Sequence, residues 1–108
     1  MNQSKRKRLE SVGFKVGSVQ EFLNLSDGEM ALIDLKIRLI QMLRAVRKER
    51  RLTQQNLAMR IGSSQSRVAK MEAADPDVSL DLICKALLVL GASPKEIGRV
   101  IGAPKRAV

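Results

Sequence analysis

Residues 52–72 read LTQQNLAMRIGSSQSRVAKME, and this stretch decides the fold. It contains two short segments with apolar residues at helical spacing, separated by Gly62. The apolar positions are Leu57 and Ile61 in the first segment and Val68 and Met71 in the second. The pattern predicts two consecutive amphipathic helices, at about 54–61 and 65–73.

The residues between these segments predict a tight turn. Thr53 and Ser64 precede the two helices, where a hydroxyl can accept a free backbone N–H. Gly62 follows the last apolar position of the first helix, and glycine adopts the left-handed conformation there without steric cost. Ala58 is small enough to let the two backbones approach where they cross. So short a separation suits two helices at a steep angle, although spacing alone leaves an ordinary helical hairpin open.

Positive charge is concentrated over this stretch. The net charge is +9, and residues 44–70 hold eight Lys/Arg against one acid, while residues 1–8 add four more cations. A basic region of this kind indicates a polyanionic partner. Cations at 44–51 can also offset the negative end of a helix dipole. However, the mutual repulsion of five cations within eight residues exceeds the stabilisation that a helix dipole provides. The charge therefore favours a nucleic-acid partner.

The motif resembles the Xre family of helix-turn-helix regulators, which are related to the Cro and cI phage repressors. The matching residues are Leu52-Thr53-Gln54, Leu57-Ala58, Ile61-Gly62, Ser64-Gln65-Ser66, Val68, Met71 and Glu72. The resemblance implies an all-α, lambda-repressor-like domain that binds a double-stranded DNA operator as a transcriptional regulator. One departure is Ser63, which stands where the family usually has an aliphatic residue, so we expect a less anchored turn.

More loosely, residues 22–101 are similar to the branch that contains HigA-like antitoxins of bacterial toxin–antitoxin pairs. That similarity implies a repressor of its own operon, with a cognate toxin as a possible further partner. Two alternatives stay open at this point. One is a protein-interaction module whose main role is to neutralise a toxin, and the other is a stand-alone or phage-type repressor without a toxin.

Polar residues on the second motif helix are the expected contacts to DNA. The side-chain amide of Gln65 can both donate to and accept from adenine, and Arg67 or Lys70 can reach guanine or phosphate. Gln54 resembles the family's glutamine that clamps the DNA backbone. For Ser66 and Arg67, a solvated surface role is the alternative. We predict DNA contacts from Gln54, Ser64, Gln65, Ser66, Arg67, Lys70, Arg50 and Arg51.

A second set of residues is expected to hold the motif together. This set comprises Ala58, Gly62, Val68, Met71, Arg47 and Glu72. The resemblance implies an internal ion pair between Arg47 and Glu72. Glu72 is then structural, and Arg47 is less available to DNA than its neighbours.

The remaining sequence predicts a compact all-α fold of five to six helices. Residues 1–17 are polar and interrupted by glycine, and we predict a flexible basic arm. Residues 18–108 are predicted to form a single helical domain, with the helix-turn-helix at 53–73. A capping box at 18–21 opens a short helix. The other predicted helices are a long one at 27–50, which precedes the motif, and two more at 80–90 and 94–101.

The long helix carries more apolar residues than one core contact requires. One stripe comprises Leu32, Leu35, Leu39, Met42, Leu43 and Val46, and a second comprises Met30, Ile33, Ile37 and Ile40. The short preceding helix can cover the second stripe. The alternative is that part of it is a homodimer seam, since repressors of this type pair two recognition helices on a two-fold operator.

Composition excludes several function classes. The chain has no His and one Cys, so a histidine triad, a zinc–histidine site and a thiolate cluster are excluded. We therefore expect no enzyme activity, no metal and no cofactor. Two phenylalanines are the only aromatic residues, which argues against binding by base stacking. No apolar run approaches membrane-spanning length, no secretory signal is evident, and the lone Cys84 fits a cytoplasmic protein.

Overall fold

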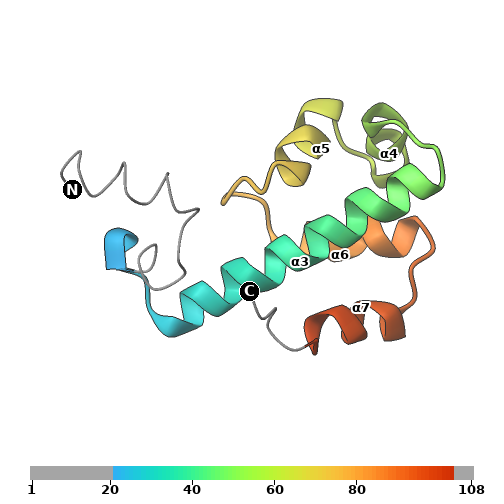
Figure 1. Cartoon of the computed structure of the whole chain (residues 1–108). Helices are drawn as coiled ribbons and strands as arrows, with labels where there is room; N and C mark the ends of the chain where they lie inside the picture. The colour runs from blue at the N-terminus through green and yellow to red at the C-terminus, as the bar shows by residue number, and fades with distance from the viewer. Residues whose placement is uncertain (1–20, 104–108) are drawn as a thin grey trace. The chain divides into compact units, whose positions relative to one another are not determined.

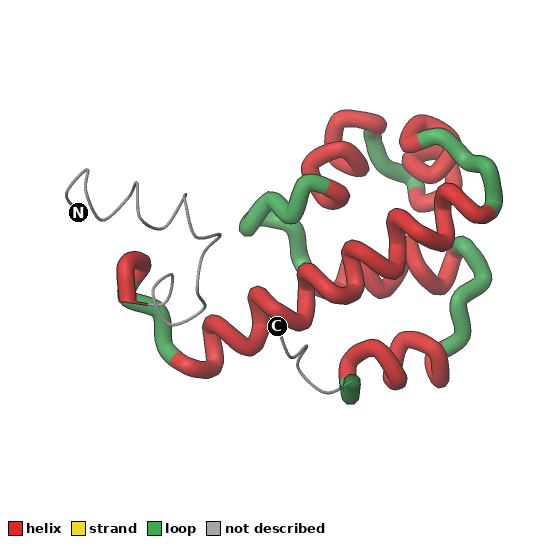
Figure 2. The backbone as a smooth tube through the Cα atoms, viewed as in Figure 1, coloured by secondary structure: helices red, strands yellow, loops and turns green. Residues whose placement is uncertain are grey.

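The computed structural model describes residues 21–103, and all regular secondary structure in this range is helical (Figure 2). The chain divides into two compact units, residues 1–34 and 35–108. The long helix α3 (Asp27–Glu49) begins in the first unit and ends in the second. The predicted arm at 1–17 lies outside the described residues. No helix within 21–103 has the length and hydropathy needed to cross a membrane.

The start of α3 is fixed by a capping box in the first unit. The backbone N–H of Ser26 donates to Glu29 Oε1 at 2.9 Å, and the N–H of Glu29 donates to Ser26 Oγ at 3.1 Å. The hydrogen bond from the Ser26 backbone lowers the pKa of Glu29. In this unit residues 21–23 are also helical, and Leu23, Leu32 and Ile33 expose much of their apolar side chains.

Four further helices follow in the second unit, within a residue or so of their predicted positions. They are α4 (Gln54–Ile61), α5 (Gln65–Glu72), α6 (Leu80–Val89) and α7 (Pro94–Ile101). Each is preceded by a residue whose side-chain hydroxyl accepts a backbone N–H from the first turn of the helix. These residues are Thr53, Ser64, Ser79 and Ser93 respectively. In Figure 1, α6 packs against α4 on one side and α7 on the other, and α5 packs on α4.

The core of the second unit combines apolar side chains from all five helices. Its fully buried members are Leu39, Leu43, Leu57, Val68, Met71, Ile83, Ala86 and Leu87. Ile40 is only 4% exposed and belongs to this core. The prediction that Ile40 belongs to a second stripe, separate from the core, is therefore wrong. The core contacts α3 over a wider part of its circumference than the first stripe alone. Ile37, one turn earlier, is 39% exposed.

Four helices in the second unit end with the same backbone hydrogen bond. An N–H two or three residues beyond the helix reaches back to a carbonyl in its last turn: Ser63 to Ala58 at 2.8 Å, Ala92 to Leu87 at 3.0 Å, Leu52 to Arg47 at 3.1 Å and Asp75 to Lys70 at 3.1 Å. Each bond needs a residue with positive φ. Gly62 and Gly91 supply two of these, whereas Arg51 and Ala74 adopt the same conformation with side chains.

The end of α7 is capped from a distant part of the chain. Arg38 Nη1, on α3, donates to the carbonyl of Val100 at 2.9 Å and to that of Ala103 at 3.0 Å. A cation at the carbonyl end of a helix also offsets its dipole. These hydrogen bonds hold the C-terminal end of α7 against α3.

Candidate nucleic-acid interface

α4 and α5 are joined by only three residues, Gly62 to Ser64, and pack against each other. Gly62 has φ +68°, and the Ser64 hydroxyl accepts the N–H of Arg67 at 3.1 Å. Ala58 is 2% exposed, as expected where two backbones cross closely. The short turn and the small residue together hold the two helices in the predicted arrangement.

The outer face of α5 is entirely polar. Gln65, Ser66, Arg67 and Lys70 are exposed, whereas Val68, Met71 and Glu72 are buried. Apart from Glu72, the buried side of α5 is apolar, so the helix lies on the surface with its apolar side against the core. This face carries two cations and two neutral polar side chains that can donate and accept hydrogen bonds.

The ion pair implied by the family resemblance is present. Arg47 Nε lies 2.6 Å from Glu72 Oε2, and Arg47 Nη2 donates to Glu72 Oε1 at 2.8 Å. Arg47 Nη1 also donates to the carbonyl of Leu52 at 2.8 Å. The two side chains are 12% and 4% exposed. This bidentate pair ties the end of α5 to the end of α3.

Both partners of the pair are held in their charged forms. Burial acts to raise the pKa of Glu72, but hydrogen bonds from Arg47 and Gln54 outweigh it and the pKa lies below its ordinary value. The hydrogen bond to Glu72 raises the pKa of Arg47. The charges therefore persist across the physiological pH range.

Two glutamines extend this pair to the protein surface. Gln54 Nε2 donates to Glu72 Oε1 at 3.2 Å, and Gln65 Nε2 donates to Gln54 Oε1 at 2.9 Å. We call Glu72, Gln54 and Gln65 the amide chain. Sequence reasoning placed Gln54 and Gln65 at the interface but did not predict this link, because it depends on how α4 and α5 are packed.

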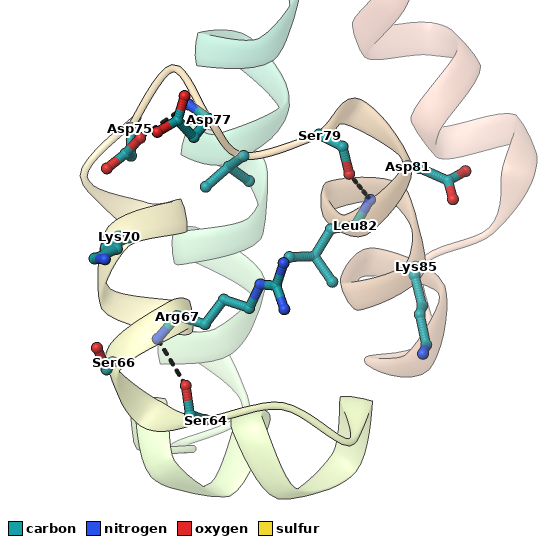
Figure 3. Close-up of a pocket in the computed structure, with 11 residues that line it drawn as sticks. Ser64, Ser66, Arg67, Lys70, Asp75, Asp77, Ser79, Asp81, Leu82 and Lys85 are labelled. Carbon is teal, nitrogen blue, oxygen red and sulfur yellow. Dashed lines mark hydrogen bonds between the residues drawn. The ribbon is translucent and has the colours of Figure 1, made fainter.

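A groove lies on each side of α5. One is lined by Arg47, Thr53, Gln54, Gln55 and Gln65, at the start of α4. The other lies between α5 and α6 and is drawn in Figure 3. Its lining comprises Ser64, Ser66, Arg67, Lys70, Asp75, Asp77, Val78, Ser79, Asp81, Leu82 and Lys85. The predicted contacts Ser64, Ser66, Arg67 and Lys70 thus meet along one groove, and Gln54 and Gln65 meet along the other.

Arg50 and Arg51 lie at the end of α3 rather than on the motif helices. Arg50 packs over the turn between α6 and α7, because a Cβ added at Gly91 would lie 3.0 Å from Arg50 Nη2. The pKa of Glu96, in the first turn of α7, is lowered mainly by hydrogen bonds from Ser93, and Arg50 contributes to that effect. Arg51 is exposed with φ +58°.

Ser63 differs from its neighbours in the turn. Its Oγ is buried, and no hydrogen-bond partner for it lies within residues 21–103. A buried hydroxyl without a partner destabilises a fold. This agrees with the expectation that a serine anchors the turn less well than an aliphatic residue.

These features define a helix-turn-helix protein whose second helix presents a polar face to solvent. The sequence profile of the helix-turn-helix family matches residues 43–97, just over half of the chain, and the chain belongs to that family, in its Xre/cI type. The all-α, lambda-repressor-like fold is thereby confirmed. The protein is a DNA-binding transcription regulator, and the family is not an enzyme family. Comparisons with curated proteins and with solved structures gave no significant match.

Proposed function

We propose that this protein is a sequence-specific repressor that inserts α5 into the major groove of an operator. The observation that carries the proposal is the exposed polar face of α5, with Gln65 held in a defined position by the amide chain. A side chain that is ordered before DNA arrives loses less conformational entropy on binding. The same eight residues are proposed as contacts as in the sequence prediction.

Gln65 is proposed to recognise adenine. Its Nε2 has two hydrogens, one of which is given to Gln54, so one N–H and the carbonyl oxygen stay available. Adenine offers an acceptor at N7 and a donor at N6 in the major groove, and this pair matches the free groups of Gln65. Lys70 and Arg67 supply positive charge beside it.

Gln54 and its neighbours are proposed to hold the DNA backbone. Gln54 and Gln55 are the first residues of α4, where backbone N–H groups are free to meet a phosphate. The side chain of Gln54 is already bonded to Glu72 and Gln65. Its backbone N–H therefore serves as the phosphate donor, while its side chain positions Gln65.

DNA titrations with a selected sequence test this proposal. The full-length protein would first enrich a duplex from a randomised library, and that duplex and a scrambled version would be titrated. We expect Gln65→Ala to weaken binding to the enriched duplex by about tenfold or more, with little change on the scrambled one. Gln41→Ala, at an exposed glutamine on α3, is the control. Equal affinity of parent and Gln65→Ala would reject α5 as the helix that reads bases.

We also propose that the repressor acts as a homodimer in the cytoplasm. Two copies would place two α5 helices about one helical turn apart on a two-fold operator. Sedimentation of the free protein and of its DNA complex tests this, and a single copy on the enriched duplex at saturation would contradict it. A two-fold symmetric enriched sequence would support it independently.

An antitoxin role is the second proposal, favoured by the apolar side chains that the first unit exposes. Leu23, Leu32 and Ile33 are 51%, 45% and 38% exposed, a surface on which a toxin could dock. Alternatively, this is a stand-alone or phage-type repressor that binds no toxin. Co-expression with the product of each adjacent gene distinguishes the two. Co-purification that Leu32→Glu abolishes supports the antitoxin role, and no co-purification contradicts it.

A further inference from the structure

The groove between α5 and α6 opens directly beside α5, the helix that is proposed to enter the DNA. A helix with its side chains is about 10–12 Å across, and the major groove is about 12 Å wide. A helix that fills the groove therefore has one phosphodiester strand along each flank. The groove at the start of α4 takes one strand, and the other strand must pass over the opposite flank of α5.

We propose that the groove between α5 and α6 binds this second DNA strand through phosphates, held by Arg67 and Lys85. The proposal rests on the proposed function, since it requires α5 to lie in the major groove. Lys85 is on α6, outside the helix-turn-helix motif, and it lines the same groove as Arg67 and Ser64. Both cations are exposed, and neither forms an ion pair with any residue in the part of the chain that the structure describes.

The charged side chains of this groove are separated by sign, with cations toward one end and aspartates toward the other. In Figure 3, Arg67 reaches across from α5 toward Leu82, and Lys85 lies at the same end as Ser64. Asp75 and Asp77 lie at the opposite end, in the loop that follows α5, and Asp81 lies one turn before Lys85 on α6.

Phosphates are therefore attracted at the Ser64 end and repelled at the loop end. The strand is thereby placed across the start of α5, next to Gln65. Arg67 contacts the backbone on this assignment, which leaves base recognition to Gln65 and Lys70. Lys85 becomes a DNA contact that the motif alone does not include.

Salt-dependent titrations of Lys85→Gln test the assignment, with Lys95→Gln as the matched control. Lys95 is an exposed lysine on α7, on the other side of α6 from the motif (Figure 1). The probes are the enriched duplex and its scrambled version. One lost phosphate contact should weaken binding roughly five- to tenfold at about 0.1 M salt, equally on both probes. The slope of log affinity against log salt should fall by about 0.9. Arg67→Gln should behave in the same way.

Each other outcome overturns a specific part of the proposal. If Lys85→Gln matches Lys95→Gln while the parent binds normally, the second strand does not use this groove. A loss confined to the enriched duplex would make Lys85 a base contact and contradict the phosphate assignment. If Lys85→Gln matches Lys95→Gln and Asp77→Asn strengthens binding, the strand crosses the loop end instead. If the parent binds neither duplex, the proposed function itself fails.

Discussion

The two ends of α5 are fixed in different ways. At its N-terminal end, Gly62 turns the chain and the Ser64 hydroxyl accepts the N–H of Arg67, so the turn and the cap that start the helix are local. At its C-terminal end, Glu72 is bonded to Arg47, which lies 25 residues earlier on α3. The start of α5 is therefore set by local contacts in the turn, and its orientation is set by a tertiary contact with α3.

Removing the tertiary anchor should have the largest effect on stability. Glu72→Ala removes the carboxylate partner of Arg47, whose side chain is only 12% exposed in the parent. Breaking a buried pair from one side costs about 3 kcal/mol. Denaturant unfolding of Glu72→Ala and of Glu49→Ala, an exposed acid at the end of α3, measures the difference. Equal losses in the two variants would mean that the C-terminal end of α5 is not anchored through this pair.

The same anchor predicts how stability responds to acid. The pKa of Glu72 is lower in the folded protein than its ordinary value of 4.5, so its contribution is complete above that value. It is lost as the pH falls through the lower, folded-state pKa. Glu72→Gln cannot take part in this titration, and its free energy of unfolding should therefore decline less steeply in acid. An identical decline in parent and variant would contradict the assignment.

A substitution in the turn before α5 should have the next largest effect on stability. Gly62→Ala forces a side chain into a left-handed conformation at φ +68°, which costs roughly 1–2 kcal/mol. Gly98→Ala is the matched control, because Gly98 lies within α7 with open space around it. There alanine should stabilise the helix by about 0.5–1 kcal/mol. The same chemical change should thus shift the melting temperature in opposite directions, and a shift in one direction for both would refute this.

Filling the turn should stabilise it by a smaller amount. Ser63→Val removes a buried hydroxyl that has no hydrogen-bond partner among residues 21–103, and it adds apolar surface at the same position. We expect a gain of about 1 kcal/mol in the free energy of unfolding. Ser66→Val, on the exposed face of α5, provides the comparison and should give no gain. A loss at Ser63 would show that the hydroxyl is satisfied in solution.

The smallest effect is expected at the turn after α5. Ala74 has φ +60°, and Ala74→Gly relieves that strain while it increases the conformational freedom of the unfolded chain. The two effects oppose each other, and we expect a net gain of about 0.5 kcal/mol. Ala73→Gly, at the preceding position with φ −89°, should destabilise the protein in the same unfolding assay. A loss for Ala74→Gly would mean that the turn after α5 tolerates its strain at no cost.

Local signals predicted the helices of the second unit closely. Serine or threonine before each of α4 to α7, and glycine after α4 and α6, mark boundaries through contacts within a few residues. The end of α5 carries no such mark, because Ala74 adopts a conformation that alanine rarely shows. The Thr53–Asn56 capping box was missed for a similar reason, since asparagine seldom closes one.

Contacts between segments that are distant in the sequence could not be predicted from local sequence patterns. The residue types at the interface were predicted from the motif, but the bond between Gln54 and Gln65 requires the crossing geometry of α4 and α5. The position of Arg50 over Gly91 and the reach of Arg38 to the end of α7 likewise depend on how the helices pack. Sequence spacing places residues on faces of helices, and tertiary packing decides which faces meet.

The direction of the amide chain has a consequence for base preference. A carboxylate only accepts, so Glu72 obliges Gln54 to present its nitrogen inward and its oxygen outward. That oxygen accepts one N–H of Gln65, so the second N–H and the carbonyl oxygen of Gln65 are the groups left for a base in the proposed contact. Glu72, a buried residue, therefore sets which atoms of the Gln65 amide stay free for the base contact proposed above. Replacing Glu72 with glutamine would let both amides flip together, so that Gln65 could offer either orientation of its amide to the proposed base contact.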